Sequence, residues 1–375
     1  MVNGGAPDNA TAVQQLAAEL NQRVSQPWTL MEVCGGQTHA IVRWGLDQLL
    51  PTDLRLIHGP GCPVCVTPTA ILDTALALAR RPDVILASYG DMLRVPGSRA
   101  GDDLLGVRAA GGDVRLVTSP LQAIDLAARH PQRQVVVLAV GFETTAPATA
   151  LLARQALALG LSNLSLLVAH VRVVPAMDAI VADPHGQVQA FLAAGHVCSV
   201  TGTGELQELV RRRRTPVAVS GFTPDELLRG LLACVDQLES GAARLDNAYG
   251  RVVRPAGNPA ARALLDQVFE PVDQAWRGLG TIAGGGLALR QAYASIDARQ
   301  RFADLFADQP ETLELRHPTG SAAGGSDCIS GLVLQGRARP CDCPAFGGRC
   351  TPEQPLGAPM VSSEGACAAW YRYRR

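Results

Sequence analysis

Cys34 and His39 belong to the first of four groups whose residue types and spacing are typical of chemical sites. Within residues 31–39, Cys34 is followed by two glycines and, five residues on, by His39. Glycines let the backbone approach a ligand closely, and a cysteine at the start of the helix expected at 40–50 gains thiolate character. A thiolate near an imidazole can bind a soft or borderline metal. A buried structural cysteine in a turn is the alternative interpretation.

The second group is a Cys-x-x-Cys motif, Cys62 and Cys65, on a Gly/Pro turn that leads directly into a helix. Two thiols at this spacing are typical of a redox dithiol, because the helix end lowers a thiol pKa and the turn tolerates the small disulfide ring. Half of a zinc site is the alternative. The chain has no second Cys-x-x-Cys, which disfavours a zinc ribbon.

Glu143 lies in the third group, residues 141–147, directly after the apolar run 134–140. The loop at the C-terminal end of a parallel strand is where α/β sheets bind ligands. We therefore treat Glu143 as a candidate for polarising a small ligand or orienting a metal ligand. Capping of the helix expected at 148–159 is the alternative.

The fourth group is a C-terminal series of cysteines. Iron–sulfur clusters usually require four thiolates, and zinc held by four cysteines is the physical competitor. The segment 316–367 has too little aliphatic content for a core of its own, so a bound metal would help to order it. The cysteines are Cys328, Cys341, Cys343, Cys350 and Cys367, one more than a cluster needs. The spacing favours a cluster without excluding zinc.

Composition restricts the class of protein. The 375 residues are 47% hydrophobic and 18% charged with a net charge of -1, which indicates a globular protein with no electrostatic case for nucleic acid or an anionic membrane. All 33 basic residues are arginine, which excludes lysine-dependent chemistry. The N-terminal residues lack signal-peptide features, so we expect a cytoplasmic protein whose ten cysteines serve metal or redox roles. Cys198 and Cys234 lie in apolar stretches and are interpreted as core residues.

The elements that must position these groups alternate between short apolar runs and Ala/Leu-rich helices from about residue 27 to 241. This alternation predicts an α/β fold of two lobes with mainly parallel sheets. We place the lobes at residues 1–125 and 126–257, and a cysteine-rich iron–sulfur domain at 258–375. The expected strands are 83–88, 113–118, 134–140, 164–169 and 216–220, and strand signals thin out after about residue 258.

Five segments together resemble the HypD family of hydrogenase maturation factors, from about residue 12 to the end. They are MEVCGGQTHAI, HGPGCPVCVTP, GFETTAP, WRGLG at 276–280 and CTPEQPLGAPMVSSEGACAAWYRY. The resemblance implies two lobes flanking a cleft and a scaffold that builds the Fe(CN)2CO group of [NiFe]-hydrogenases. It also implies a heterodimer with the chaperone HypC and cyanide supplied by HypE. The hydrogenase large subunit would be an indirect partner.

The same resemblance implies roles for individual residues. Cys34 would bind Fe(II) that carries CN and CO, with His39 assisting, and Cys62 and Cys65 would be the dithiol beside it. A [4Fe–4S] cluster would pass electrons to that dithiol; its ligands would be Cys328, Cys343, Cys350 and Cys367. Cys341 could replace Cys328, and family members often have cysteine where this chain has Ser330 and Pro359.

Two other functions remain open from the sequence. An iron–sulfur-linked thiol-disulfide oxidoreductase would need Cys62 and Cys65 but not Cys34. A zinc-stabilised binding module would contain zinc and no acid-labile sulfide.

Overall fold

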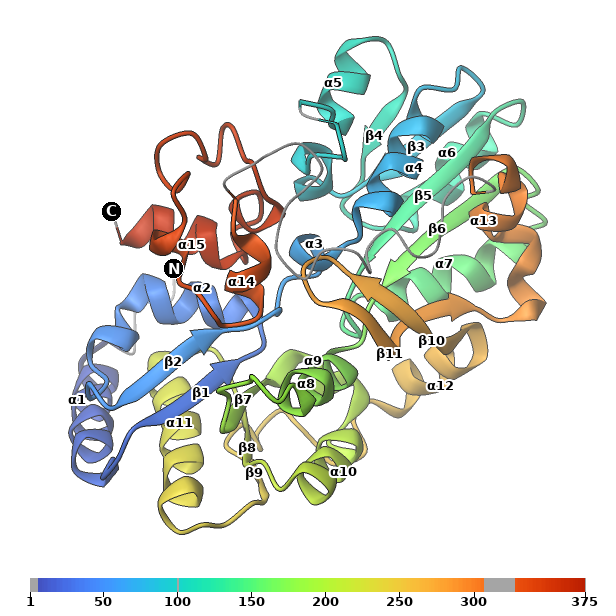
Figure 1. Ribbon diagram of the computed structural model, residues 1–375. Helices are drawn as coiled ribbons and strands as arrows, with labels where there is room; N and C mark the ends of the chain where they lie inside the picture. Colours follow the sequence, from blue (N-terminus) through green and yellow to red (C-terminus); the bar gives the residue numbers. More distant parts are fainter. Residues whose placement is uncertain (1–5, 100, 307–327, 375) are drawn as a thin grey trace.

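The computed structural model describes residues 6–99, 101–306 and 328–374. These residues form an α/β fold with two parallel sheets in two lobes, which confirms the expected class (Figure 1). The first sheet has the order β2-β1-β7-β8-β9 and the second the order β4-β3-β5-β6. The strands of the first sheet are β1 (Trp28–Glu32), β2 (Leu54–His58), β7 (Ala190–Ala194), β8 (Val217–Ser220) and β9 (Leu245–Asn247). Those of the second are β3 (Val84–Ser88), β4 (Val114–Leu116), β5 (Gln134–Gly141) and β6 (Leu164–His170).

The two sheets divide the chain differently from the expected domains 1–125 and 126–257. Strands β3 and β4 precede the expected boundary and β5 follows it, yet all three pair in one sheet. Strand β1 pairs instead with β7, which comes after all four strands of the second sheet. The boundary after residue 125 is therefore wrong for the sheets, because an alternating pattern marks strands without specifying which strands pair.

Helices cover both lobes. The helix predicted at 40–50 is α2 (Gly35–Trp44), which begins five residues earlier and stops at Gly45 with a left-handed φ of 66°. A capping box formed by Thr223 and Glu226 stands at the start of α11. The other helices of the lobes are α1 (Ala6–Arg23), α3 (Pro63–Val66), α4 (Thr69–Ala79), α5 (Leu104–Ala109), α6 (Gln122–Arg129), α7 (Ala146–Ala158), α8 (Val173–Ala182), α9 (Gly195–Thr201), α10 (Gly204–Arg213) and α11 (Pro224–Glu239). Within the described part of the chain, no helix combines the length and apolar character needed to cross a bilayer.

An antiparallel hairpin, β10 (Phe269–Trp276) and β11 (Gly280–Leu289), follows α12 (Pro259–Val268) in a region where few strand signals were expected. Glycines 284–286 interrupt the apolar pattern of β11, which explains why this strand is hard to recognise. Phe269 and Tyr293 pack in the core of the second lobe. The expected third domain, 258–375, is therefore split, and its first part, through α13 (Ala298–Arg301), joins the second lobe.

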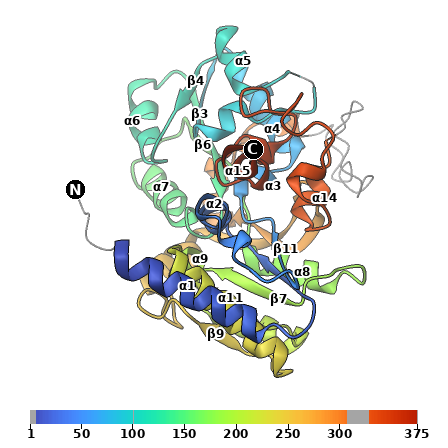
Figure 2. The ribbon, with the colours of Figure 1, turned by 90° about the vertical axis from the view of Figure 1, so that its left-hand side faces the viewer.

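Residues 328–374 form the cysteine-rich segment, which lies between the two lobes in both views (Figures 1 and 2). It contains α14 (Ser330–Leu334), the short 3-10 helices η6 (Pro340–Asp342) and η7 (Ala358–Met360), and α15 (Ala366–Tyr373). Arg94 of the second lobe donates to the carbonyls of Pro352 at 3.1 Å and Val361 at 2.9 Å. Within this segment, Cys350 and Cys367 pack with Val333 and Met360 in a small hydrophobic core. The cysteines thus contribute to the packing of this segment.

Candidate metal and dithiol site

Cys34 follows β1 and is the N-cap residue of α2. Its backbone N–H donates to Oε2 of Glu32 at 2.9 Å, and its carbonyl accepts from the N–H of Thr38 at 2.9 Å. The C-terminal end of a parallel strand thus meets the N-terminus of a helix at this cysteine. This is the position at which α/β sheets bind ligands.

Glu32 organises the surroundings of Cys34, and sequence reasoning did not single it out. Its side chain is fully buried. Its Oε1 accepts from the Thr38 hydroxyl and lies 2.8 Å from Nδ1 of His58. Glu32 and His58 are register partners at the ends of neighbouring strands, so the pairing could be recognised only once the strand order was known. A buried carboxylate requires such partners.

Replacing Glu32 with glutamine is expected to lower the free energy of unfolding by about 2–4 kcal/mol. The carboxylate accepts hydrogen bonds from its neighbours, and the NH2 group of a glutamine side chain would place a donor against those donors. Urea denaturation measures the effect. Glu19→Gln is the matched control, since Glu19 forms an exposed ion pair with Arg23. An unchanged stability of the E32Q protein would contradict the role given to Glu32.

Burial raises the pKa of the Cys34 thiol to about 12. The backbone N–H groups of Gln37 and Gly36 act in the opposite direction, and the charges of Glu32 and Glu364 add to the rise. The expectation that the helix start gives this cysteine thiolate character is therefore wrong, because desolvation outweighs the amides. Binding of a metal at this sulfur requires loss of the thiol proton.

Cys62 and Cys65 form a disulfide, with their Cα atoms 5.2 Å apart. Both residues are buried. The N–H of Gly35 donates to the carbonyl of Gly61 at 2.7 Å, and a Cβ on Gly61 would lie 2.3 Å from the Cys34 nitrogen. Only glycine permits this approach, so the Cys34 motif and the Cys-x-x-Cys motif are in direct backbone contact.

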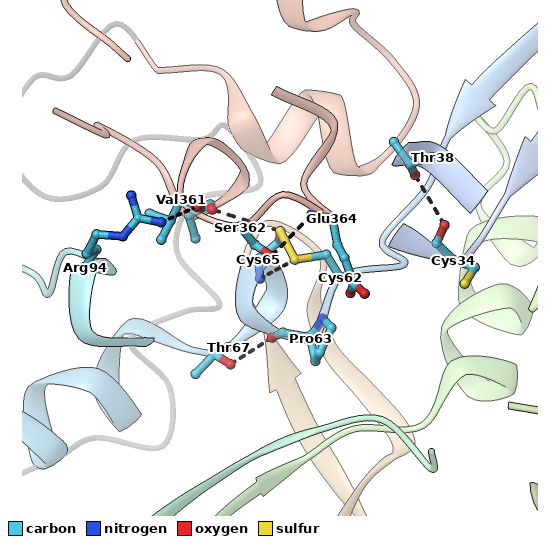
Figure 3. The surroundings of a disulfide bond; sticks show 11 residues. Cys34, Thr38, Cys62, Pro63, Cys65, Thr67, Arg94, Val361, Ser362 and Glu364 are labelled. Carbon is cyan, nitrogen blue, oxygen red and sulfur yellow. Dashed lines mark hydrogen bonds between the residues drawn. A yellow bond between two sulfur atoms is a disulfide. The ribbon is translucent and has the colours of Figure 1, made fainter. Parts of the chain in front are cut away.

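Figure 3 shows the C-terminal segment beside the disulfide, with Val361, Ser362 and Glu364 facing it. A Cβ on Gly35 would collide with Glu364, which shows how closely that segment approaches the start of α2. Three stretches that are far apart in sequence therefore meet at this point.

His39 is not brought to Cys34. Its Nδ1 lies 3.2 Å from the carbonyl oxygen of Ser363, and its Nε2 lies 3.3 Å from the hydroxyl of Tyr373. Both ring nitrogens thus face the C-terminal segment. In this geometry His39 links α2 to α15 rather than completing a ligand pair.

Glu143 is buried in the loop after β5. Its Oε1 accepts from the N–H of Val173 at 3.0 Å, whereas Oε2 has no hydrogen-bond partner among the described residues. Cys198 belongs to the core cluster against which Cys34 packs; burial raises the pKa of its thiol, and the charges of Glu143 and Cys34 add to the rise. Cys198 is buried as expected, but it borders the site rather than a remote part of the core.

Burial raises the pKa of Glu143 from 4.5 to about 7. The folded protein therefore holds a proton that the unfolded chain releases, and its stability should fall by about 3 kcal/mol as the pH rises from about 4.5 to about 7. Glu143→Gln is expected to remove this decrease, which urea unfolding at several pH values measures. The exposed Glu270 provides the control as Glu270→Gln. Equal pH profiles for wild type and E143Q would contradict the shifted pKa.

The four cysteines proposed as cluster ligands line one cavity in the C-terminal segment. Ser330 and Pro359, the positions where the resembled family often has cysteine, line the same cavity. Cys341 is exposed and is not part of the lining, so Cys328 is the better-placed of the two alternatives. The four are Cys328, Cys343, Cys350 and Cys367.

This donor set fits an iron–sulfur cluster chemically, since it consists of thiols alone. The charges of the other three cysteines act on Cys367, and burial raises its pKa. The N–H of Leu356 donates to Sγ of Cys350 at 3.3 Å, a contact that favours a thiolate. Among the described residues, no three His, Cys, Asp or Glu side chains are grouped closely enough to hold a metal ion, so the thiols must adjust to receive one.

The helix η7 connects the cavity to the disulfide. Pro359 and Met360 line the cavity, while the carbonyl oxygen of the preceding residue, Ala358, lies 4.0 Å from Sγ of Cys65. A single short helix therefore separates the buried disulfide from the cysteine-lined cavity.

Known proteins resemble this chain over almost its whole length. A family model described as "HypD: Hydrogenase formation hypA family" matches residues 11–374. The hydrogenase maturation factor HypD of Azotobacter vinelandii is 46% identical over 377 residues, which cover 98% of this chain and 95% of that protein. The proteins of the same name from Rhodobacter capsulatus and Escherichia coli are 42% and 40% identical, over 96% and 97% of this chain and 93% and 94% of their own lengths.

The fold and these relatives define the chain as a hydrogenase maturation factor. It belongs to the HypD family.

Proposed function

We propose that this protein is the scaffold and redox component on which the Fe(CN)2CO unit of [NiFe]-hydrogenase is assembled. In this proposal iron is held at Cys34 together with HypC, cyanide is received from HypE, and the completed unit passes on toward the hydrogenase large subunit. The protein is cytoplasmic and acts as a heterodimer with HypC.

The observation that carries the proposal is the direct backbone contact between the Cys34 motif and the Cys62–Cys65 disulfide. Cyanide and carbon monoxide stabilise low-spin Fe(II), which needs a soft donor, and a thiolate at Cys34 is such a donor. The iron is cargo at this position. Cys34 gives up its proton when the iron binds, and the partly buried position of this cysteine reduces its contact with water and oxygen.

The disulfide supplies the redox capacity of the site. Two electrons and two protons convert the Cys62–Cys65 disulfide into two thiols, and reoxidation returns them. The four cysteines that line the C-terminal cavity would hold a [4Fe–4S] cluster, which when bound supplies single electrons beside η7. The carbonyl of Ala358 lies against Cys65, so electrons would have a short distance to cross.

The disulfide itself also favours a second function, an iron–sulfur-linked thiol-disulfide oxidoreductase. That function requires an external disulfide to reach Cys62 or Cys65. Both residues are almost completely shielded, with 2% and 0% exposure. The scaffold is therefore the better interpretation, because its redox partner lies within the same chain.

Mössbauer spectroscopy tests the proposal on protein purified anaerobically with HypC from cells grown on iron-57. A [4Fe–4S] signal together with a separate low-spin Fe(II) signal is the expected result, and Cys34→Ala should remove only the second. Zinc without acid-labile sulfide would refute the cluster. Turnover of a generic disulfide by the C34A protein would favour the oxidoreductase instead.

A further inference from the structure

Three rings stand at the carboxyl edge of the first sheet, where Cys34 also lies. They are His196, Phe222 and Tyr249, which follow β7, β8 and β9, whereas Cys34 follows β1. The rings of His196 and Phe222 are stacked, with centroids 3.7 Å apart and planes at 22°. The ring of Tyr249 meets Phe222 edge-on at a centroid distance of 6.3 Å. The edge at which parallel sheets bind ligands therefore carries an aromatic group next to the thiol.

Phe222 is the ring that reaches the sulfur of Cys34. A Cβ on Gly36 would lie 3.2 Å from Cε1 of Phe222 and 3.8 Å from Sγ of Cys34. The ring and the sulfur therefore border the same small space over the start of α2. Phe222 is partly buried, and His196, which is stacked on it, is exposed. The two rings thus extend from the start of α2 out to the protein surface and cover this side of the sulfur.

The backbone that carries Phe222 is held in place. Tyr249 packs between the loops after β7 and β8, because a Cβ on Gly195 would lie 2.6 Å and one on Gly221 2.7 Å from its ring. Gln37 of α2 donates its amide to the carbonyl of Gly221 at 3.3 Å. The residue before Phe222 is therefore tied to the helix that Cys34 begins. Movement past this point requires the ring itself to turn.

We propose that Phe222 is a steric filter beside Cys34, which admits small reactants to the sulfur and excludes bulky disulfides. A ring turning on a fixed backbone opens a narrow gap, because the neighbouring space is filled by His196 and Tyr249. A metal ion or a reagent of a few atoms can pass through such a gap. A disulfide made of two peptides cannot.

The excluded chemistry is thiol–disulfide exchange. The thiolate of Cys34 would form a bond to one sulfur of a glutathione-type disulfide, the S–S bond of that disulfide would break, and one glutathione thiolate would leave. The resulting cap would occupy the sulfur and prevent it from binding a metal. The inference deepens the proposed function and rests on it for its purpose, since the thiol must stay uncapped until iron arrives.

Two probes that both convert the thiol into a disulfide test the filter on the purified, iron-free full chain. Methyl methanethiosulfonate transfers a CH3S group and releases methanesulfinate, whereas oxidised glutathione transfers a glutathionyl group and releases glutathione. Trypsin cleaves at arginine and produces the peptide 24–43, which contains Cys34 as its only cysteine. Mass spectrometry of this peptide over time therefore gives both rates for Cys34 alone.

Phe222→Ala is expected to raise the rate with oxidised glutathione about tenfold, because passage no longer requires the aromatic contacts to break. The rate with the small probe should change little. Phe222→Trp should keep the wild-type ratio of the two rates, since a larger ring still covers the sulfur. Phe306→Ala is the control, because Phe306 is a partly buried ring against the core of the second lobe. An unchanged ratio in F222A, or an equal rise with both probes, would overturn the filter.

His196→Ala provides a second arm that leaves Phe222 in place. Because His196 is exposed, its removal should not prevent folding, so this variant decides the question if F222A does not fold. Without its stacking partner the Phe222 ring turns more easily, and a smaller selective rise with oxidised glutathione is expected. A wild-type ratio in H196A would contradict the role of the stack. Failure of the scaffold function would appear separately, as normal hydrogenase maturation by C34A.

Discussion

Replacing Cys34 with alanine is expected to abolish hydrogenase maturation while leaving the proposed C-terminal cluster intact. Alanine removes the soft donor at the start of α2, and no other side chain at that position can replace it. The backbone hydrogen bonds of residue 34, to Glu32 and Thr38, do not depend on its side chain, so the fold should survive. Hydrogenase activity in a complemented deletion strain and the iron and acid-labile sulfide of the purified variant measure the two effects.

Cys234→Ala is the matched control for this experiment. Cys234 is a buried thiol on α11, where its Sγ contacts the carbonyl of Phe191 at 3.3 Å. Maturation should continue in the C234A strain, because this sulfur lies in the core of the first lobe among residues that take no part in the proposed site. Normal hydrogenase activity with C34A would show that iron is not held there.

Replacing Cys367 with serine is expected to remove nearly all cluster iron and acid-labile sulfide and to destabilise the C-terminal segment. Cys367 lies on α15, is buried, and lines the cavity together with three other thiols. A hydroxyl is a poor substitute for a thiolate toward iron–sulfur clusters. The absorbance of the anaerobic protein and chemical analysis of iron and sulfide measure the loss.

Cys341→Ser is the control, because Cys341 is exposed and does not line the cavity. It should keep its cluster, whereas Cys328→Ser should lose it. The reverse result would assign the first ligand to Cys341. Full cluster content in C367S would contradict the cavity as the site.

Much of the site could be predicted from local sequence. The Cys-x-x-Cys turn predicts that Cys62 and Cys65 lie close together, because both residues and their turn are contiguous. The strands of the second sheet and β8 could be recognised from apolar runs, whereas β1, β2, β7 and β9 were not among the expected strands. Glu143 could be named as a candidate site residue because it directly follows such a run. Features that depend on contiguous residues can be predicted without knowing which strands pair.

The remaining features depend on contacts between distant segments. Glu32 meets His58 only because β1 and β2 are adjacent in register. The ring nitrogens of His39 contact the C-terminal segment instead of Cys34, because α15 packs against α2 and places the Tyr373 hydroxyl at one nitrogen, while the Ser363 carbonyl before α15 lies at the other. The thiol pKa of Cys34 is set by burial, which a sequence motif does not reveal. Each of these differences comes from tertiary packing that overrides a local expectation.

The insertion of one lobe into the other has a consequence for synthesis on the ribosome. Strands β1 and β2 emerge first, but the partner of β1 on its other side, β7, follows only after residues 59–189. The four strands of the second sheet are contiguous in the chain, so this sheet can form before the first sheet is complete, since closing so long a loop is slow. The C-terminal segment that faces the Cys62–Cys65 disulfide and the start of α2 is translated last. A nascent chain therefore carries its reactive thiols uncovered, and the site becomes complete only when translation ends.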